Sequence, residues 1–233
     1  MTDCYRFADI TAEITTEYDL FHELSRDYRV DGPAVLSVRT DVEDISYERE
    51  RSPENAPDDY LEMIAVQRKL SEAFPAFGVF LFHASALCMD GDGYLFAALS
   101  GTGKSTHAAL WRQVFGDRVT MLNDDKPFLR IGDDVTVFGS PWDGKHRLSV
   151  NQSAKVKAIC LLERSAENAI TPISFAEAFP LLYRQAYRPK DREALAKTLD
   201  LLNLLGEKVR FYRLCCNMDP EAALVAYGGM CRE

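Results

Sequence analysis

The sequence predicts an α/β fold, with a mixed central β-sheet, flanking helices and a small strand-rich unit at the N-terminus. Three observations predict it. Apolar strand-like runs alternate with helical patterns after residue 78, a glycine-rich loop joins one of these runs to a helix, and the strand before that loop follows another strand through a tight turn at 91–93. Strands joined by a tight turn pair antiparallel, so the sheet is expected to be mixed rather than doubly wound and parallel.

Two parts of the chain differ in their pattern of strand-like and helical segments. Residues 1–77 are expected to form a small α+β unit, and residues 78–233 the main domain with the glycine-rich loop. The first part carries strand-like alternation of apolar and polar residues at 5–10 and again at 34–38, with few glycines.

Between these strands and the main domain lies a charged stretch, 41–59, which contains two prolines and is expected to be an exposed connection. A helix is expected to follow. Asp58 or Asp59 can cap its N-terminus, apolar residues recur at helical spacing, and Pro75 stops it after Phe74.

The main domain is expected to alternate strands and helices to the C-terminus. Its first two strands flank the 91–93 turn, and the segment after the glycine-rich loop opens a helix. The expected elements are a strand at 80–89, a strand at 94–99, a helix at 104–115, a strand at 119–123, a hairpin around 132–134, a polar loop at 140–151, a strand at 156–162, helices near 174–188 and 190–206, a strand at 210–216 and a last helix begun by Asp219-Pro220.

Composition excludes several classes of partner. The formal net charge of −9 argues against nucleic acid, which needs a cationic surface. No apolar run approaches the roughly 20 residues of a membrane-spanning helix, and the N-terminus does not resemble a signal peptide, so we expect no membrane association and a cytoplasmic location. The six cysteines show no Cys-x-x-Cys pair; we expect reduced core thiols and no zinc site.

The glycine-rich loop has the features of a phosphate-binding P-loop. Gly101 and Gly103 allow consecutive backbone N–H groups to face phosphates, the Lys104 ammonium can reach the β- and γ-phosphates, and the Ser105 hydroxyl can ligate Mg²⁺. Ala98 stands where the strict pattern has glycine, yet the segment follows a strand and opens a helix, as a P-loop does. We therefore expect ATP and Mg²⁺ as ligands, bound by Ser100, Gly101, Thr102, Gly103, Lys104, Ser105 and Thr106.

A pair of carboxylates follows the next strand. The strand at 119–123 runs directly into Asp124 and Asp125, the position of a Walker-B-like acid. One of the two can hold Mg²⁺ while the other accepts a proton from an attacking hydroxyl. Chemistry alone does not decide which does which, because closely spaced carboxylates titrate as a coupled pair.

Four segments together resemble the catalytic domain of the HPr kinase/phosphorylase family, whose P-loop fold is shared with phosphoenolpyruvate carboxykinase. The similarity runs from about residue 80 to the C-terminus. The segments are Phe82-His83-Ala84-Ser85, Leu99-Ser100-Gly101-Thr102-Gly103-Lys104-Ser105, Asn123-Asp124-Asp125 and Ser140-Pro141-Trp142-Asp143-Gly144-Lys145.

The resemblance implies a kinase that moves the γ-phosphoryl group of ATP to a hydroxyl, usually a serine of a protein or peptide. It implies Asp125 as the base, Asp124 as the metal ligand and a role for His83. The loop at 140–147 adds Lys145 and Arg147 as cations for the developing phosphoryl charge. The family's second signature is absent and residues 1–75 differ from its usual N-terminal domain, so HPr itself is not the implied acceptor.

Other functions compete with this prediction. The acceptor could be a small hydroxyl compound, or the chain could be a regulatory or scaffold protein that binds ATP without turning it over. A carboxykinase would need arginines grouped around a dicarboxylate, and here they are scattered. The complete set of Lys104, Ser105, Asp124 and Asp125 favours catalysis, because a pure binder has less use for a metal ligand and a base together. A homo-oligomer is possible on this sequence.

Overall fold

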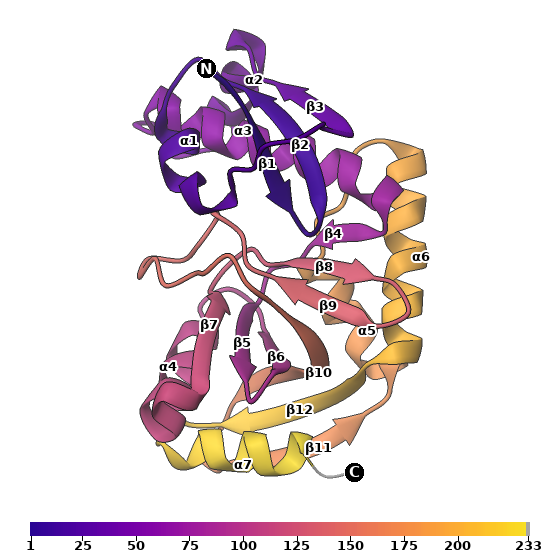
Figure 1. The fold of residues 1–233 in the computed structure, drawn as a ribbon. Coiled ribbons are helices and arrows are strands. Elements are labelled where there is room, and N and C mark those ends of the chain that lie inside the picture. The colour runs from indigo at the N-terminus through magenta and orange to yellow at the C-terminus, as the bar shows by residue number, and fades with distance from the viewer. Residues whose placement is uncertain (232–233) are drawn as a thin grey trace.

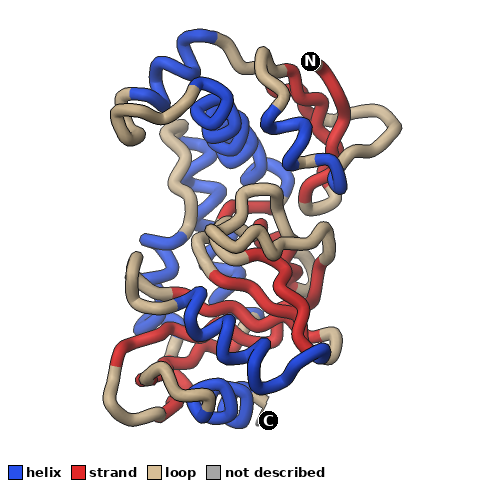
Figure 2. Tube along the Cα trace, turned by 90° about the vertical axis from the view of Figure 1, so that its left-hand side faces the viewer, coloured by secondary structure: helices blue, strands red, loops and turns tan. Residues whose placement is uncertain are grey.

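The structure, a computed structural model, describes residues 1–231 and contains two β-sheets with helices packed around them (Figure 1). A three-stranded sheet belongs to the N-terminal part, and a nine-stranded mixed sheet forms the rest. Figure 2 shows the N-terminal part stacked on one end of the larger sheet. The predicted α/β class with a small strand-rich N-terminal unit is confirmed.

The N-terminal sheet begins with a hairpin of β1 (Thr2–Phe7) and β2 (Ile10–Thr15). The turn between them consists of Ala8 and Asp9, whose φ angles of 47° and 62° lie in the left-handed region. The predicted strand at 5–10 therefore crosses a turn, since alternation of apolar residues continues through it. The third strand, β3 (Leu36–Arg39), pairs parallel with β2.

The stretch at 41–59 is largely exposed, as its charge predicts, but it contains a helix that the sequence did not predict. Residues Val42–Arg49 form helix α2, and Asp41 begins it with a capping box: its carboxylate accepts from the Asp44 N–H, and the Asp44 carboxylate accepts from the Asp41 N–H. Arg68 on helix α3 (Asp58–Ala73) donates to the Asp44 and Glu48 carboxylates, which holds α2 against α3. Helix α2 lacks an apolar face, and ion pairs with α3 hold it in place instead.

Helix α3 has the expected extent, but neither Asp58 nor Asp59 caps it. Pro57 occupies the N-cap position, and no side chain there accepts a hydrogen bond from the helix. The two aspartates lie in the first turn, where negative charge favours the helix dipole. Short helices complete this part of the fold: α1 (Leu20–Leu24), η1 (Arg26–Tyr28) and η2 (Phe74–Phe77).

The large sheet has the strand order β4-β8-β9-β10-β6-β5-β7, and β12 pairs with both β10 and β11. Strand β5 runs antiparallel to β6, which confirms the mixed sheet beside the loop strand. The predicted strand at 80–89 is wrong in one respect: it is interrupted, and its halves join different parts of the sheet. The strands are β4 (Val79–Leu81), β5 (Ser85–Met89), β6 (Asp92–Ala97), β7 (Val119–Asn123), β8 (Phe128–Ile131), β9 (Val135–Phe138), β10 (Ser153–Arg164), β11 (Ala169–Ile173) and β12 (Arg210–Cys216).

Helices cover both faces of this sheet. On one face, α4 (Lys104–Phe115) and α7 (Glu221–Met230) bury Trp111 and Met230 against the strands. On the other face, α5 (Phe175–Gln185) and α6 (Arg192–Lys208) bury Leu182 and Leu202. A short turn, η3 (Gly116–Arg118), links α4 to β7. All four helices lie close to the predicted positions.

A third apolar cluster joins the N-terminal unit to the main sheet. It contains Phe7 and Phe21 from the N-terminal unit together with Leu81, Phe128 and Trp142 from the main domain. The expected boundary at residue 77 falls at Gly78, whose φ of 75° turns the chain from η2 into β4. Packing is continuous across this boundary, so the N-terminal unit helps to shape the surface of the main domain.

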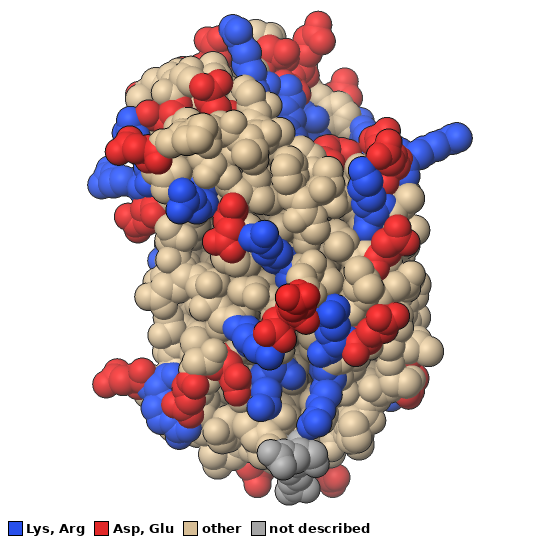
Figure 3. Space-filling model, turned by 45° about the vertical axis from the view of Figure 1, so that its right-hand side comes forward, with Lys and Arg blue, Asp and Glu red and all other residues tan. Residues whose placement is uncertain are grey.

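The surface carries charges of both signs. On the face in Figure 3, lysines and arginines are interspersed with aspartates and glutamates. Within residues 1–231 no helix combines the length and apolarity that crossing a membrane requires. The cysteines are all free, but only Cys160 is buried; Cys231 is exposed and the others are half-buried, so the expectation of core thiols is wrong for most of them.

Candidate functional site

The glycine-rich loop predicted to be a P-loop lies between a strand and a helix, as its sequence indicates. It leaves β6 at Ala97, passes through Gly101 and Gly103 with φ angles of 77° and 124°, and enters α4 at Lys104. These angles lie where side chains are disfavoured, which explains the two glycines. Gly103 is the N-cap of α4, so the free N–H groups and the positive end of the helix dipole face the loop interior, an arrangement that suits phosphate.

Three chain segments meet at the ends of the strands, where the P-loop begins. Strands β6 and β7 both pair antiparallel with β5, which lies between them, so the ends of β6 and β7 lie beside the start of β5. The P-loop follows β6, Asp124 and Asp125 follow β7, and His83 immediately precedes β5. Topology thus brings together residues about 20 positions apart in sequence.

Asp125 lies at the centre of a charged cluster. Its Oδ1 is 3.1 Å from the His83 Nε2 and 2.9 Å from the Lys126 Nζ. Burial would raise the pKa of Asp125, but hydrogen bonds and charge from His83 and Lys126 outweigh it and lower the pKa to about 2. Since this lies below the usual value of about 4, ionised Asp125 stabilises the fold at neutral pH, and that contribution is lost as the pH falls toward 2.

Asp124 is held differently from its neighbour. Its Oδ1 accepts a hydrogen bond of 2.6 Å from the hydroxyl of buried Ser85, and its backbone N–H donates to the Asp143 Oδ1 at 3.0 Å. Within residues 1–231 the Asp124 Oδ2 accepts no hydrogen bond. A carboxylate fixed through one oxygen with the other free has the arrangement of a metal ligand with an outer-sphere partner.

Lys104 is buried at the start of α4, and its ammonium donates to the Ala98 carbonyl at 3.1 Å. Burial lowers the pKa of Lys104, and the negative charges of Asp125 and Asp124 oppose that shift in part. Lysine and the two aspartates therefore interact electrostatically across the same site. A triphosphate in the loop would give the ammonium a stronger partner than a single carbonyl.

The 140–151 loop reaches this site through its backbone. A Cβ built on Gly144 would lie 3.1 Å from the Asp124 Oδ2, so glycine permits the close approach. The side chains of Lys145 and Arg147 are exposed and form no ion pair or hydrogen bond with another residue of the described chain. Arg147 has a left-handed φ of 47°. The structure thus brings the loop to Asp124 and leaves the roles of these two cations as proposals.

Sequence reasoning passed over the residues that hold the site together. Asn123 is fully buried; its amide oxygen accepts from the N–H groups of Asp125 and Lys126, and its amide nitrogen donates to the Ser140 carbonyl. Asn123 therefore joins the aspartate turn to the 140–151 loop. An asparagine at a strand end beside two acids is a signal that could have suggested it.

Arg164 supports the P-loop from outside. Its guanidinium donates to the carbonyls of Thr102 and Gly101, which turns the loop's acceptors away from its interior. Nothing in the local sequence indicates this contact, because β10 reaches the P-loop only through sheet pairing with β6.

Three cavities border the site. One, of about 690 Å³, lies beside Ser100–Thr102 and reaches Arg184 on α5. A second, of about 490 Å³, lies beside Gly101–Gly103 and extends to the ends of β10 and β12 at Leu162 and Cys216. The third, also of about 490 Å³, lies between the N-terminal unit and Asp125, and we call it the N-terminal cleft. Its walls include Leu24, Tyr28, Met63, Trp142 and Ser149.

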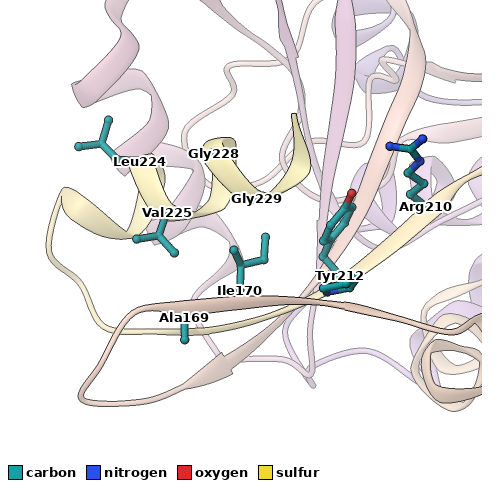
Figure 4. Close-up of a pocket in the computed structure, with 9 residues that line it drawn as sticks. Ala169, Ile170, Arg210, Tyr212, Leu224, Val225, Gly228 and Gly229 are labelled. Carbon is teal, nitrogen blue, oxygen red and sulfur yellow. The ribbon is translucent and has the colours of Figure 1, made fainter. Parts of the chain in front are cut away.

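Another cavity, of about 680 Å³, lies elsewhere, between α7 and strands β11 and β12 (Figure 4). Ile170, Tyr212, Leu224 and Val225 make its lining mainly apolar. None of its lining residues belongs to the P-loop or the aspartate pair. This cavity and the one of about 690 Å³ beside the P-loop have similar volumes, so size alone does not identify the candidate site, which is defined by its convergent polar groups.

Ser85→Ala is expected to destabilise the protein by about 1.5–3 kcal/mol, because the buried Asp124 carboxylate loses a hydrogen bond to a charged group. Urea unfolding measures the loss. The matched control is Ser37→Ala, which removes a hydroxyl–carboxylate contact to Glu13 at the surface and should change stability by less than about 0.5 kcal/mol. Equal effects of the two variants would contradict a structural role for the Ser85 hydroxyl.

Comparison with known proteins gives a distant structural similarity and no sequence match. No protein-family model matches this chain, and no curated protein does. Among solved structures, the HPr(Ser) kinase/phosphatase from Coxiella burnetii is similar over 64% of this chain and 88% of its own, with 12% sequence identity and a TM-score of 0.39. Neither the site nor the function proposed below rests on this similarity.

Proposed function

We propose that this protein is an ATP-dependent kinase that transfers the γ-phosphoryl group to a hydroxyl, a serine of a peptide or protein being the leading acceptor. One observation carries the proposal: a P-loop, a paired aspartate and a histidine meet at one sheet edge, with His83 3.1 Å from Asp125. Phosphoryl transfer needs these parts together, a cradle for the triphosphate and a carboxylate for the nucleophile.

The triphosphate of ATP would bind against residues Ser100–Thr106. The Lys104 ammonium would contact its β- and γ-phosphates. The cavity beside the loop, lined by Thr106 and His107 and by the ends of β10 and β12, offers space for the base and ribose. The Nε2 of buried His107 accepts a hydrogen bond from the Trp111 indole, so the proton of a neutral ring is on Nδ1. That N–H has no partner within residues 1–231 and borders the cavity.

Mg²⁺ would bind to Ser105 and Asp124. The residues fit: the Asp124 Oδ2 and the Ser105 hydroxyl accept no hydrogen bond within the described chain, and Ser105 is exposed at the P-loop. No three His, Cys, Asp or Glu side chains of residues 1–231 are grouped to hold a metal. This suits Mg²⁺, which typically takes one or two carboxylates and completes its shell with phosphate oxygens and water. When bound, the ion would neutralise phosphate charge.

Asp125 would orient the acceptor hydroxyl and take its proton. A carboxylate with a pKa of about 2 is a weak base. In a loose transition state the attacking oxygen loses its proton late, when bonding to phosphorus has already made it acidic, so a weak base suffices. His83 and Lys126 would fix the carboxylate. Lys145 and Arg147 are proposed to approach the γ-phosphate, because no other residue in the described chain pairs with them.

A non-catalytic ATP-binding protein is the main alternative. It would need the P-loop but has no use for an ionised Asp125 held by two partners, so the His83–Asp125–Lys126 cluster favours catalysis. A kinase for a small hydroxyl compound uses the same machinery and differs only in what fills the N-terminal cleft.

The test is transfer of label from [γ-³²P]ATP with Mg²⁺ to components of a lysate from the source organism. We expect labelled product with the wild-type protein and none with Lys104→Ala, which removes the ammonium at the phosphates. A fluorescent ATP analogue measures binding separately. Binding of ATP without acceptor-dependent transfer in any fraction would support the scaffold alternative, and equal labelling by the two proteins would overturn the kinase function.

A further inference from the structure

The N-terminal cleft opens directly onto the proposed base. Asp125 and Lys126 form part of its wall, and the opposite wall comes from α1, η1 and α3 of the N-terminal unit. A molecule in the cleft therefore touches Asp125 on one side and the N-terminal unit on the other. The volume of about 490 Å³ is in the range of small-molecule sites, which bury most of their ligand.

Tyr28 and Ser149 line the cleft, and neither hydroxyl has a hydrogen-bond partner within residues 1–231. Tyr28 is only 4% exposed, and its Oη forms no hydrogen bond with residues 1–231. The Ser149 Oγ is buried and equally unpaired. A buried polar group without a partner costs about 1–3 kcal/mol, so two in one cleft are expected to serve a ligand. Burial, with the negative charges of Asp143 and Asp27, raises the pKa of Tyr28, so its hydroxyl keeps its proton and can donate.

The other side chains of the cleft include apolar residues and a carboxylate that is already hydrogen-bonded. Leu20, Leu24 and Met63 supply apolar surface from the N-terminal unit, and Trp142 adds to it from the main domain. The nearby carboxylate of Asp143 already accepts from the N–H groups of Asp124, Gly144 and Ser149. The groups left for a ligand thus include two hydroxyls, an apolar surface, the Asp125 carboxylate and the Arg147 guanidinium, which also lines the cleft.

We propose that the N-terminal cleft binds the phosphoryl acceptor, and that this acceptor carries its hydroxyl next to a carbonyl or carboxylate and an apolar group. The carbonyl or carboxylate would accept from Tyr28 and Ser149 while the hydroxyl meets Asp125. This inference rests on the proposed kinase function. A serine within an extended peptide and a free hydroxy amino acid share this chemistry.

The transfer step then balances within the site. The acceptor oxygen forms a bond to the γ-phosphorus, and the bond between that phosphorus and the β–γ bridging oxygen breaks. ADP leaves with the electron pair of the broken bond, and the hydroxyl proton passes to the Asp125 carboxylate. Tyr28 is a positioning residue here, and the N-terminal unit selects the acceptor.

The test compares Tyr28→Phe with the wild-type protein and uses Tyr18→Phe as the matched control. Tyr18 is 39% exposed in the N-terminal unit, and its hydroxyl faces Asp58 outside the cleft. Two acceptor sets are offered with [γ-³²P]ATP and Mg²⁺: peptides with a central serine and randomised flanks, and free L-serine, L-threonine and N-acetyl-L-serine. The set that becomes labelled shows whether the acceptor is a serine in a peptide or a free hydroxy amino acid.

Tyr28→Phe is expected to raise KM for the labelled acceptor about tenfold, the loss of one hydrogen bond to a ligand, and to leave KM for ATP unchanged. Thermal stability should not fall, because the hydroxyl has no partner in the free protein. Tyr18→Phe should match wild type throughout. An unchanged acceptor KM in Tyr28→Phe would overturn the inference, as would transfer to neither set. Labelling of a folded lysate protein would still uphold the kinase function, whereas failure to bind ATP would defeat that function itself.

Discussion

Asp125→Asn is expected to lower the rate of phosphoryl transfer by about 10²–10⁴-fold, the range that a positioned base contributes. The amide cannot take the acceptor's proton and no longer offers a charged partner to His83 and the Lys126 ammonium. ATP binding should persist, because the P-loop amides and the Lys104 side chain remain in place. Single-turnover transfer and binding of a fluorescent ATP analogue measure the two properties separately.

Asp133→Asn is the control for this variant. Asp133 lies in the exposed turn between β8 and β9, away from the site, and its neutral replacement should leave both transfer and binding unchanged. Circular dichroism verifies that each variant is folded. Turnover by Asp125→Asn within threefold of the wild-type rate would show that Asp125 is not the base and would direct attention to Asp124.

Trp142→Ala is expected to reduce the free energy of unfolding by about 3–5 kcal/mol, as for other buried tryptophans. Trp142 is 6% exposed, and its ring packs 5.7 Å from the ring of Phe7 and 6.1 Å from those of Phe21 and Phe128. Its indole N–H donates to the Met63 carbonyl at 3.1 Å. The substitution removes the side chain that joins the 140–151 loop to the N-terminal unit.

Trp142→Phe separates packing from hydrogen bonding. It keeps most of the apolar contact, loses the bond to Met63 and should cost about 0.5–1.5 kcal/mol for that bond, because the Met63 carbonyl lies inside α3 and keeps its helical hydrogen bond. Urea unfolding of both variants gives the two terms. Losses below about 1 kcal/mol in both would mean that the loop and the N-terminal unit are not coupled through this ring.

The local elements of the main domain were largely predictable. Helix α4 and strand β7 have the predicted limits, because a P-loop, a helical pattern and a strand ending in acids are local signals. Helix α2 was missed because its stability comes from a capping box and from Arg68 on another helix, whereas its own sequence is charged and lacks an apolar face. The break between β4 and β5 was missed because apolar residues continue through it.

The candidate site divides in the same way. P-loop residues and the aspartate pair were identifiable, since a phosphate cradle and a strand-end carboxylate have sequence patterns of their own. The supporting contacts were not, because Ser85, Asn123 and Asp143 act through hydrogen bonds between segments that only the sheet brings together. Tyr28 carries no pattern at all, and its unpaired hydroxyl is visible only where two units of the fold meet.

The sequence by itself determined the α/β class, the glycine-rich turn between strand and helix and the order of the elements around it, because hydrophobic period, glycines and acids act over a few residues. Only the tertiary structure decided that His83 contacts Asp125, that one Asp124 oxygen is held by Ser85, and that the N-terminal unit closes a cleft over the site. The physical reason is distance along the chain. Strand pairing and the packing of Trp142 join segments that are far apart in sequence, and the local sequence of each segment does not indicate which other segment it contacts.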